Sequence, residues 1–193
     1  MLRRLYDWTL SLAGTPNADR ALAVVSFVES SFFPIPPDVL LIPMVIARRE
    51  RWFRIATICT VASLAGALLG YAIGMFLYDQ VAVPLLSFYG KANSLDSLKA
   101  WFTQWGYWAV LFAAVTPFPF KVLTIFSGFA ALNLPIFLGA AIVGRSARFY
   151  LVSYLLYHFG EPIRGFIEKN LGVLFTLFMV ALIGGFVAIR YLF

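Results

Sequence analysis

Hydrophobic residues make up 62% of the 193 residues and charged residues only 12%, whereas ordinary soluble domains are about half apolar and about a quarter charged. This composition excludes a soluble domain, because a chain this short cannot bury so much apolar surface, and a bilayer covers the excess. The net charge of +6 does not indicate nucleic acid as a partner, since the basic residues flank apolar stretches. One cysteine, Cys59, and one histidine, His158, exclude an intrachain disulfide and a multi-histidine metal site, and we expect no cofactor.

Residues 1–20 precede the first long apolar stretch. Two groups of side chains lie on opposite faces of a helix drawn through this segment: Leu2, Leu5, Trp8 and Leu12, and Arg3, Arg4 and Asp7. The break at residues 14–17 comes too early for a signal peptide. We therefore expect a retained segment at the membrane interface, with a frayed terminus as the alternative.

Five apolar stretches follow, at residues 21–47, 55–78, 107–132, 136–157 and 171–191. A helix needs about 20 apolar residues to span a bilayer, and the second, fourth and fifth stretches provide them without a break. Prolines interrupt the other two, at Pro34, Pro36 and Pro37 in the first and at Pro117 and Pro119 in the third. Because proline lacks an amide donor and restricts the residue before it, each half of these stretches reaches only about half of the membrane.

The basic residues decide between a kinked span and a re-entrant hairpin for the first stretch. Two clusters flank it: Arg3, Arg4 and Arg20 before, and Arg48, Arg49, Arg51 and Arg54 after. Lys and Arg concentrate on the cytoplasmic side of a membrane, and only a hairpin places both clusters there. The same reasoning, continued along the chain, makes the third stretch a hairpin that enters from the opposite side and keeps the N-terminus in the cytoplasm.

The second stretch carries three glycines four residues apart, Gly66, Gly70 and Gly74. Such a ridge of small residues is typical of close helix packing, and we assign it no chemistry.

Residues 84–105 are expected on the outer surface. Leu95, Leu98, Phe102 and Trp105 recur at helical spacing, and aromatic residues cluster from position 101 to position 108, as in an aromatic belt. We expect an amphipathic helix that anchors the chain and does not bind a ligand.

The two proline breaks resemble each other. Residues 34–42 align without gaps with residues 117–125 and share the pattern P-x-P-x-(charge)-V-L-x-I. One span separates the copies, so the two hairpins enter from opposite faces, as in the inverted-topology repeats that place transporter sites near the midplane. The predicted fold is an all-α polytopic membrane protein, with two re-entrant helical hairpins in an inverted-topology repeat, three full transmembrane helices and interfacial amphipathic helices. A polar cavity is expected between the hairpin tips.

Five charged residues fall at membrane depth, where each costs about 2.5–3.5 kcal/mol without a partner: Glu29, Asp38, Lys121, Arg145 and Arg148. The three cations suit an anionic group such as phosphate, which arginine binds in bidentate fashion. A carboxyl group in such surroundings can carry a proton. Structural roles stay open: Asp38 as a helix cap, Lys121 snorkelling to the interface, and either arginine in an ion pair with Glu29 or Asp38.

Three motifs resemble the DedA family of bacterial inner-membrane proteins, in the SNARE-associated Golgi protein or VTT-domain superfamily, and most of all its YqaA-like branch. They are E-x4-P-x-P-x-D from Glu29 to Asp38, P-F-P-F-K from Pro117 to Lys121, and G-R-S-A-R-F-Y at residues 144–150. The resemblance covers about residues 20–160. Commoner members carry arginine before and after the proline of the second loop, where this chain has Thr116 and Lys121.

The resemblance implies two opposed hairpins and the movement of phospholipid or polyprenyl phosphate across the inner membrane, linked in some members to the proton motive force. It implies proton coupling at Glu29 and Asp38. It also implies that the basic residues, here Lys121, Arg145 and Arg148, bind the lipid phosphate.

We therefore expect a lipid flippase or scramblase whose working site lies at the proline-rich loops. A coupled carrier of a small anion and a membrane assembly factor that transports nothing are the alternatives. An enzyme is not expected, because the sequence has no Ser/His/Asp set, metal-ligand cluster or phosphate-binding glycine loop. The lipid, the direction of transport, the coupling ion and the formation of a homo-oligomer are left open.

Overall fold

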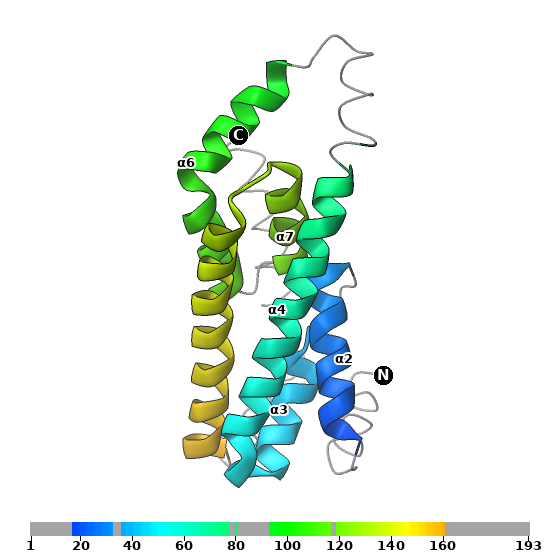
Figure 1. Ribbon diagram of the computed structural model, residues 1–193. Coiled ribbons are helices and arrows are strands. Elements are labelled where there is room, and N and C mark those ends of the chain that lie inside the picture. The colour runs from blue at the N-terminus through cyan, green and yellow to red at the C-terminus, as the bar shows by residue number, and fades with distance from the viewer. Residues whose placement is uncertain (1–16, 33–35, 78–79, 81–92, 117–118, 161–193) are drawn as a thin grey trace, which may run out of the picture.

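The computed structural model describes residues 17–32, 36–77, 80, 93–116 and 119–160. Within these residues every regular element is a helix (Figure 1). The elements are α2 (Ala18–Ser31), α3 (Asp38–Ala47), the short 3-10 helix η1 (Arg49–Arg51), α4 (Trp52–Leu77), α6 (Asn93–Val115), α7 (Phe120–Phe129) and a long helix at Leu134–Gly160, named the arginine helix below. The expected all-α class is confirmed for this part of the chain.

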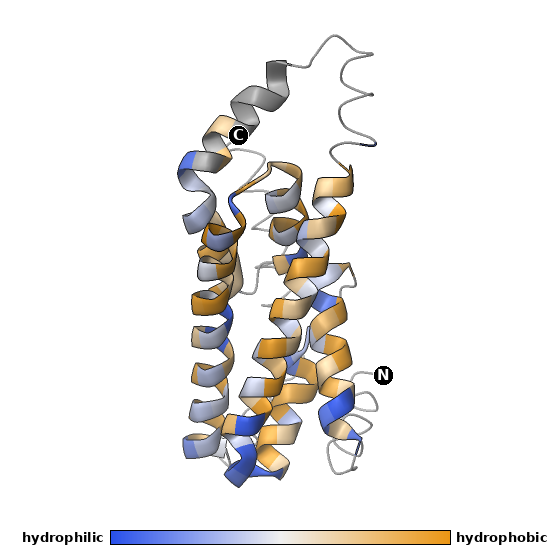
Figure 2. Cartoon of the chain, in the orientation of Figure 1, coloured by the Kyte–Doolittle hydropathy of each residue, from blue (hydrophilic) through white to orange (hydrophobic). Residues whose placement is uncertain are grey.

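Among the described residues, two helices are long and apolar enough to cross a membrane, Arg49–Leu77 with 29 residues and Leu134–Gly160 with 27. Each is about 40 Å long at 1.5 Å per residue, which exceeds the hydrocarbon thickness of a bilayer. Figure 2 shows mostly apolar residues along α4, hydrophilic residues in the middle of the arginine helix, and further hydrophilic residues where α2 begins and where α3 leads into α4. The expected span at residues 171–191, and nearly all of the interfacial segment at residues 1–20, lie outside the described residues.

The first proline break separates two helices that lie side by side along one half of α4 (Figure 1). α2 ends at Ser31, and α3 begins at Asp38 with Pro37 at its capping position. α3 has only 10 residues, or about 15 Å, so it is too short to cross a bilayer. Pro34 lies outside the described residues.

The second break has a short helix after it as well. α7 also has 10 residues, begins directly after Pro119, and lies along the other half of α4 (Figure 1). Ala131, with a φ of 53°, turns the chain from α7 into the arginine helix. The two halves of α4 are therefore covered by helices from different breaks. Pro117 lies outside the described residues.

α6 corrects a predicted boundary. A surface helix was expected to end at residue 105 and the second hairpin to begin at residue 107, whereas one helix runs from Asn93 to Val115. Gly106 lies at the expected boundary and is buried against Phe102 and Leu132. No proline interrupts the chain between Asn93 and Val115, so the helix continues through the glycine.

α4 packs against helices from both proline breaks, α2 and α7, through its glycine ridge. Gly66 faces the backbone of Phe27 in α2, and Gly74 faces the backbone of Ile125 in α7. A side-chain carbon at either glycine would overlap a carbonyl oxygen of the neighbouring helix, so only glycine permits this close approach. The predicted packing role of the ridge is confirmed.

Replacing Gly74 with alanine is expected to destabilise the contact between α4 and α7, because the new methyl group would overlap the carbonyl oxygen of Ile125. Overpacking of this kind costs about 1–3 kcal/mol, so the melting temperature of the purified protein should fall by several degrees. Gly139→Ala is the matched control, since nothing lies within 4 Å of a side-chain carbon built there. Equal melting temperatures for the two variants would show that this contact does not stabilise the fold.

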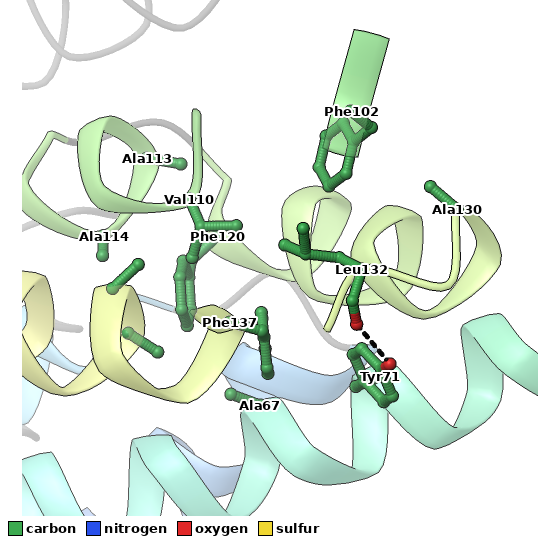
Figure 3. Close-up of a cluster of buried hydrophobic side chains, with 12 residues drawn as sticks. Ala67, Tyr71, Phe102, Val110, Ala113, Ala114, Phe120, Ala130, Leu132 and Phe137 are labelled. Atoms are coloured by element: carbon green, nitrogen blue, oxygen red, sulfur yellow. Dashed lines mark hydrogen bonds between the residues drawn. The ribbon is translucent and has the colours of Figure 1, made fainter. Parts of the chain in front are cut away.

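A cluster of apolar side chains joins α4, α6, α7 and the arginine helix (Figure 3). Phe120 and Phe137 are fully buried in it. The hydroxyl group of Tyr71 donates to the carbonyl oxygen of Leu132 at 2.6 Å. These contacts hold the start of the arginine helix against α4. The middle of the arginine helix then lies next to α2 and α3.

Candidate functional site

The arginine helix carries Arg145 and Arg148 on one face, as their three-residue spacing requires. Arg145 is 1% exposed, and the side chain of Arg148 is 16% exposed. Both guanidinium groups extend to residues that flank the first proline break. The sequence left open an ion pair between either arginine and Glu29 or Asp38, and in the structure both arginines form one.

Arg145 pairs with Glu29, near the end of α2. Its Nη2 lies 2.6 Å from Oε2 of Glu29 and also donates to Oγ of Ser30 at 3.1 Å. The Ser30 hydroxyl donates to the same Glu29 oxygen at 2.9 Å. The guanidinium group of Arg145 lies 4.1 Å from the ring centroid of Phe120, which adds a cation–π contact. A charged group that the apolar interior would exclude is thus held by a carboxylate, a hydroxyl and an aromatic ring.

Arg148 pairs with Asp38, the first residue of α3. Its Nη2 lies 2.6 Å from Oδ2 of Asp38, and its Nη1 donates to the carbonyl oxygen of Thr116 at 2.5 Å. Thr116 directly follows α6, so Arg148 connects the start of α3 to the end of α6. The capping role considered for Asp38 is corrected, because Pro37 holds the N-cap position and makes no side-chain cap bond.

Lys121 is the second residue of α7 and is half-buried. Its charge interacts with that of Glu29. Among the described residues, no ion pair within 4.0 Å involves Lys121. Within the part of the chain that the structure describes, it is therefore the cation of this set without a carboxylate at close range.

The two breaks meet through residues that the sequence analysis did not single out. Thr124 of α7 donates its hydroxyl proton to the carbonyl oxygen of Ser30 in α2 at 3.0 Å. Both residues are fully buried. Two signals in the sequence pointed to them: Ser30 follows Glu29 inside an apolar helix, and Thr124 is polar where the first copy of the repeat has Leu41.

The loop prolines in the described residues adjoin this site. Pro37 is buried, Pro36 and Pro119 are half-buried, and Pro37 and Pro119 stand directly before α3 and α7. Proline at the start of a helix is favourable, since its fixed φ suits the first turn and no amide donor is lost there.

The arrangement suits an anion. Two carboxylates and three cations leave one net positive charge at the site when all five are ionised. Nε of Arg145 is buried and has no hydrogen-bond partner among the described residues, so it can donate to an additional acceptor. Among the described residues, no group of three or more His, Cys, Asp or Glu side chains could hold a metal ion.

The fold and the site define a helical membrane protein whose helices are linked by arginine–carboxylate pairs, one with a buried arginine and one half-buried. Its residues 35–158 match the VTT domain, so the chain belongs to the VTT-domain family. The matched region includes Asp38, Lys121 and both arginines, whereas Glu29 lies before it. The superfamily resemblance expected from the sequence is thereby confirmed, and the YqaA-like branch stays a prediction.

Two relatives have similar sequences. An uncharacterized protein of Haemophilus influenzae is 34% identical over 184 residues, which is 95% of each chain. A second uncharacterized protein, from Histophilus somni, is 34% identical over 151 residues, or 78% of each chain. No solved structure matches the chain significantly.

Proposed function

We propose that this protein moves a phosphate-bearing lipid, either a phospholipid or polyprenyl phosphate, across a bacterial inner membrane as a flippase or scramblase of the YqaA-like type. The observation that supports this most strongly is that Arg145 and Arg148, in the middle of a helix long enough to cross the membrane, each pair with one carboxylate at 2.6 Å. Well-packed apolar residues usually stabilise a protein as much as a buried ion pair does. A binding role accounts for charges that stability alone does not require.

The proposal includes re-entrant hairpins around the two proline breaks, with the N-terminus in the cytoplasm. The short helices α3 and α7 on opposite halves of α4 support this arrangement. The close approach of Gly66 to Phe27 has a counterpart in the second half, where Gly144 of the arginine helix packs against Ala114 of α6. Matching crossings of this kind are expected from an inverted-topology repeat.

Lipid phosphate and the two carboxylates would compete for the same guanidinium groups, because phosphate and carboxylate both offer arginine two oxygen atoms. A phosphate bound to Arg145 or Arg148 releases Glu29 or Asp38, which can then take up a proton. A phosphodiester, with one negative charge, neutralises the net charge of the site unaided. A phosphomonoester with two negative charges leaves the site neutral when one carboxyl group also binds a proton, which couples transport to protons.

Replacing Lys121 with glutamine is expected to lower the rate of lipid flipping about tenfold, because this cation has no close carboxylate among the described residues and we propose that it binds the phosphate. A charge-assisted hydrogen bond contributes about 1.5–3 kcal/mol, and about 1.4 kcal/mol corresponds to a factor of ten. Purified protein in liposomes that contain fluorescent phospholipid or polyprenyl phosphate provides the measurement. Lys121→Arg keeps the charge and should keep most of the rate.

The same liposomes, assayed also for uptake of inorganic phosphate, distinguish the lipid transporter from a small-anion carrier and from an assembly factor. Uptake of inorganic phosphate without any lipid movement would favour a carrier of a small anion. Wild-type liposomes that move neither lipid nor phosphate would favour an assembly factor and contradict the proposal.

A further inference from the structure

The hydrogen bond between α2 and α7 involves a carbonyl group that a proline leaves without its helical donor. In an α-helix, the carbonyl oxygen of Ser30 would accept a hydrogen bond from the amide of residue 34, but that residue is proline and has none. The hydroxyl group of Thr124 in α7 supplies the missing donor at 3.0 Å. Gly70 of α4 makes room, since a side-chain carbon there would overlap the Thr124 hydroxyl.

The side chain of Ser30 is bonded on three sides. It donates to Glu29, accepts from Arg145 at 3.1 Å, and lies 2.7 Å from the hydroxyl oxygen of Ser63 in α4. A hydroxyl group has one proton and two lone pairs, so all three sites are used when Ser63 is the donor. Ser30 is fully buried, and water does not compete for these bonds. One residue therefore contacts the ion pair, α4 and α7 at once.

The link to α7 has an alternative partner. The hydroxyl group of Thr124 also lies 2.9 Å from the carbonyl oxygen of Lys121 in its own helix. One proton serves two acceptors, so the hydroxyl can leave Ser30 and donate fully to Lys121 without becoming an unsatisfied buried donor. Breaking the α2–α7 contact therefore leaves the Ser30 carbonyl oxygen without this donor, whereas the Thr124 hydroxyl keeps a partner in its own helix.

We propose that Ser30 is a positioning residue: its hydroxyl group holds Glu29 and Arg145 in one ion pair, and its carbonyl group ties that pair to the second break through the releasable bond from Thr124. A change at the ion pair, such as the arrival of a phosphate, is then transmitted to α7. The transport consequence of this inference rests on the proposed function, whereas the coupling itself does not.

The coupling is tested without transport by a mutant cycle of Glu29→Gln and Thr124→Val, measured as melting temperatures in detergent. Residues in one hydrogen-bond network usually couple by an amount that corresponds to about 2–4 °C in a chain of this size. With Ser30 present, we expect the double variant to depart from the sum of the single variants by about 2 °C. The same cycle in Ser30→Ala protein should be additive. Additivity in both backgrounds, or equal coupling in both, overturns the inference.

The transport consequence has its own controls. Thr124→Val should lower the maximal flip rate about fivefold, as expected for the loss of one hydrogen bond, with little change in the half-saturating lipid concentration. Thr124→Ser keeps the hydroxyl group and should keep the rate. Ser31→Ala is the matched control for Ser30→Ala, because Ser31 is equally buried and, within the described residues, its hydroxyl group donates to the carbonyl oxygens of Phe27 and Gly66 and not to the ion pair. Equal losses of rate for Ser30→Ala and Ser31→Ala contradict a positioning role. If the wild-type protein moves no lipid, the proposed function fails while the mutant cycle still decides the coupling.

Discussion

Replacement of Arg145 with methionine is expected to destabilise the protein by about 3–5 kcal/mol, because Glu29 keeps a buried charge and loses the cation 2.6 Å away. Methionine is long and flexible enough to retain contact with the ring of Phe120, so packing changes less than charge does. Chemical unfolding of the purified protein in detergent provides the measurement.

A second substitution isolates the ion pair. The double variant Arg145→Met with Glu29→Gln should recover most of the lost stability, since no uncompensated charge is left in the interior. Glu29→Gln alone should also be destabilised, because it leaves Arg145 without its carboxylate. A double variant as unstable as Arg145→Met alone would show that Arg145 does not stabilise the protein through its ion pair with Glu29.

Replacement of Arg148 with alanine is expected to lower the rate of lipid flipping about 10–100-fold. The change removes a guanidinium group that we propose binds lipid phosphate, and a hydrogen bond to a charged group contributes about 1.5–3 kcal/mol. The liposome assay with fluorescent lipids measures the rate. The melting temperature, recorded in parallel, separates loss of function from loss of folded protein.

Arg54→Ala is the matched control for Arg148→Ala. Arg54 is also paired with an aspartate, Asp19, at 3.1 Å, but its side chain is 66% exposed. Exposed ion pairs contribute little, so this variant should keep both its stability and its flip rate. A folded Arg148→Ala protein with the wild-type rate, or an equal loss of rate in the two variants, would remove Arg148 from the proposed site.

Much of the fold followed from the sequence because its signals are local. Uninterrupted apolar length predicted both long helices, and proline chemistry predicted the ends of α2 and the starts of α3 and α7. The continuity of α6 through Gly106 was not predicted, because a change from surface helix to hairpin was expected there, although no proline interrupts residues 93–115.

The candidate site was predictable to a different extent. All five ionisable residues of the candidate site were predicted because each lies within an apolar stretch, where an unpaired charge is costly and therefore rare. Which acid pairs with which arginine depends on how the helices cross, and a single sequence does not encode that in any local pattern. Ser30 and Thr124 were missed for a related reason: serine and threonine are common in apolar helices, and only the crossing brings one to the carbonyl group of the other.

The central claim is that lipid phosphate takes the place of a carboxylate on Arg145 or Arg148. The most direct measurement is a structure of the protein determined with phospholipid or a short-chain polyprenyl phosphate bound. We predict phosphate oxygens within hydrogen-bonding distance of Arg145 or Arg148, with Glu29 or Asp38 no longer paired with that arginine. A lipid phosphate bound elsewhere while both ion pairs keep their 2.6 Å contacts would contradict this account.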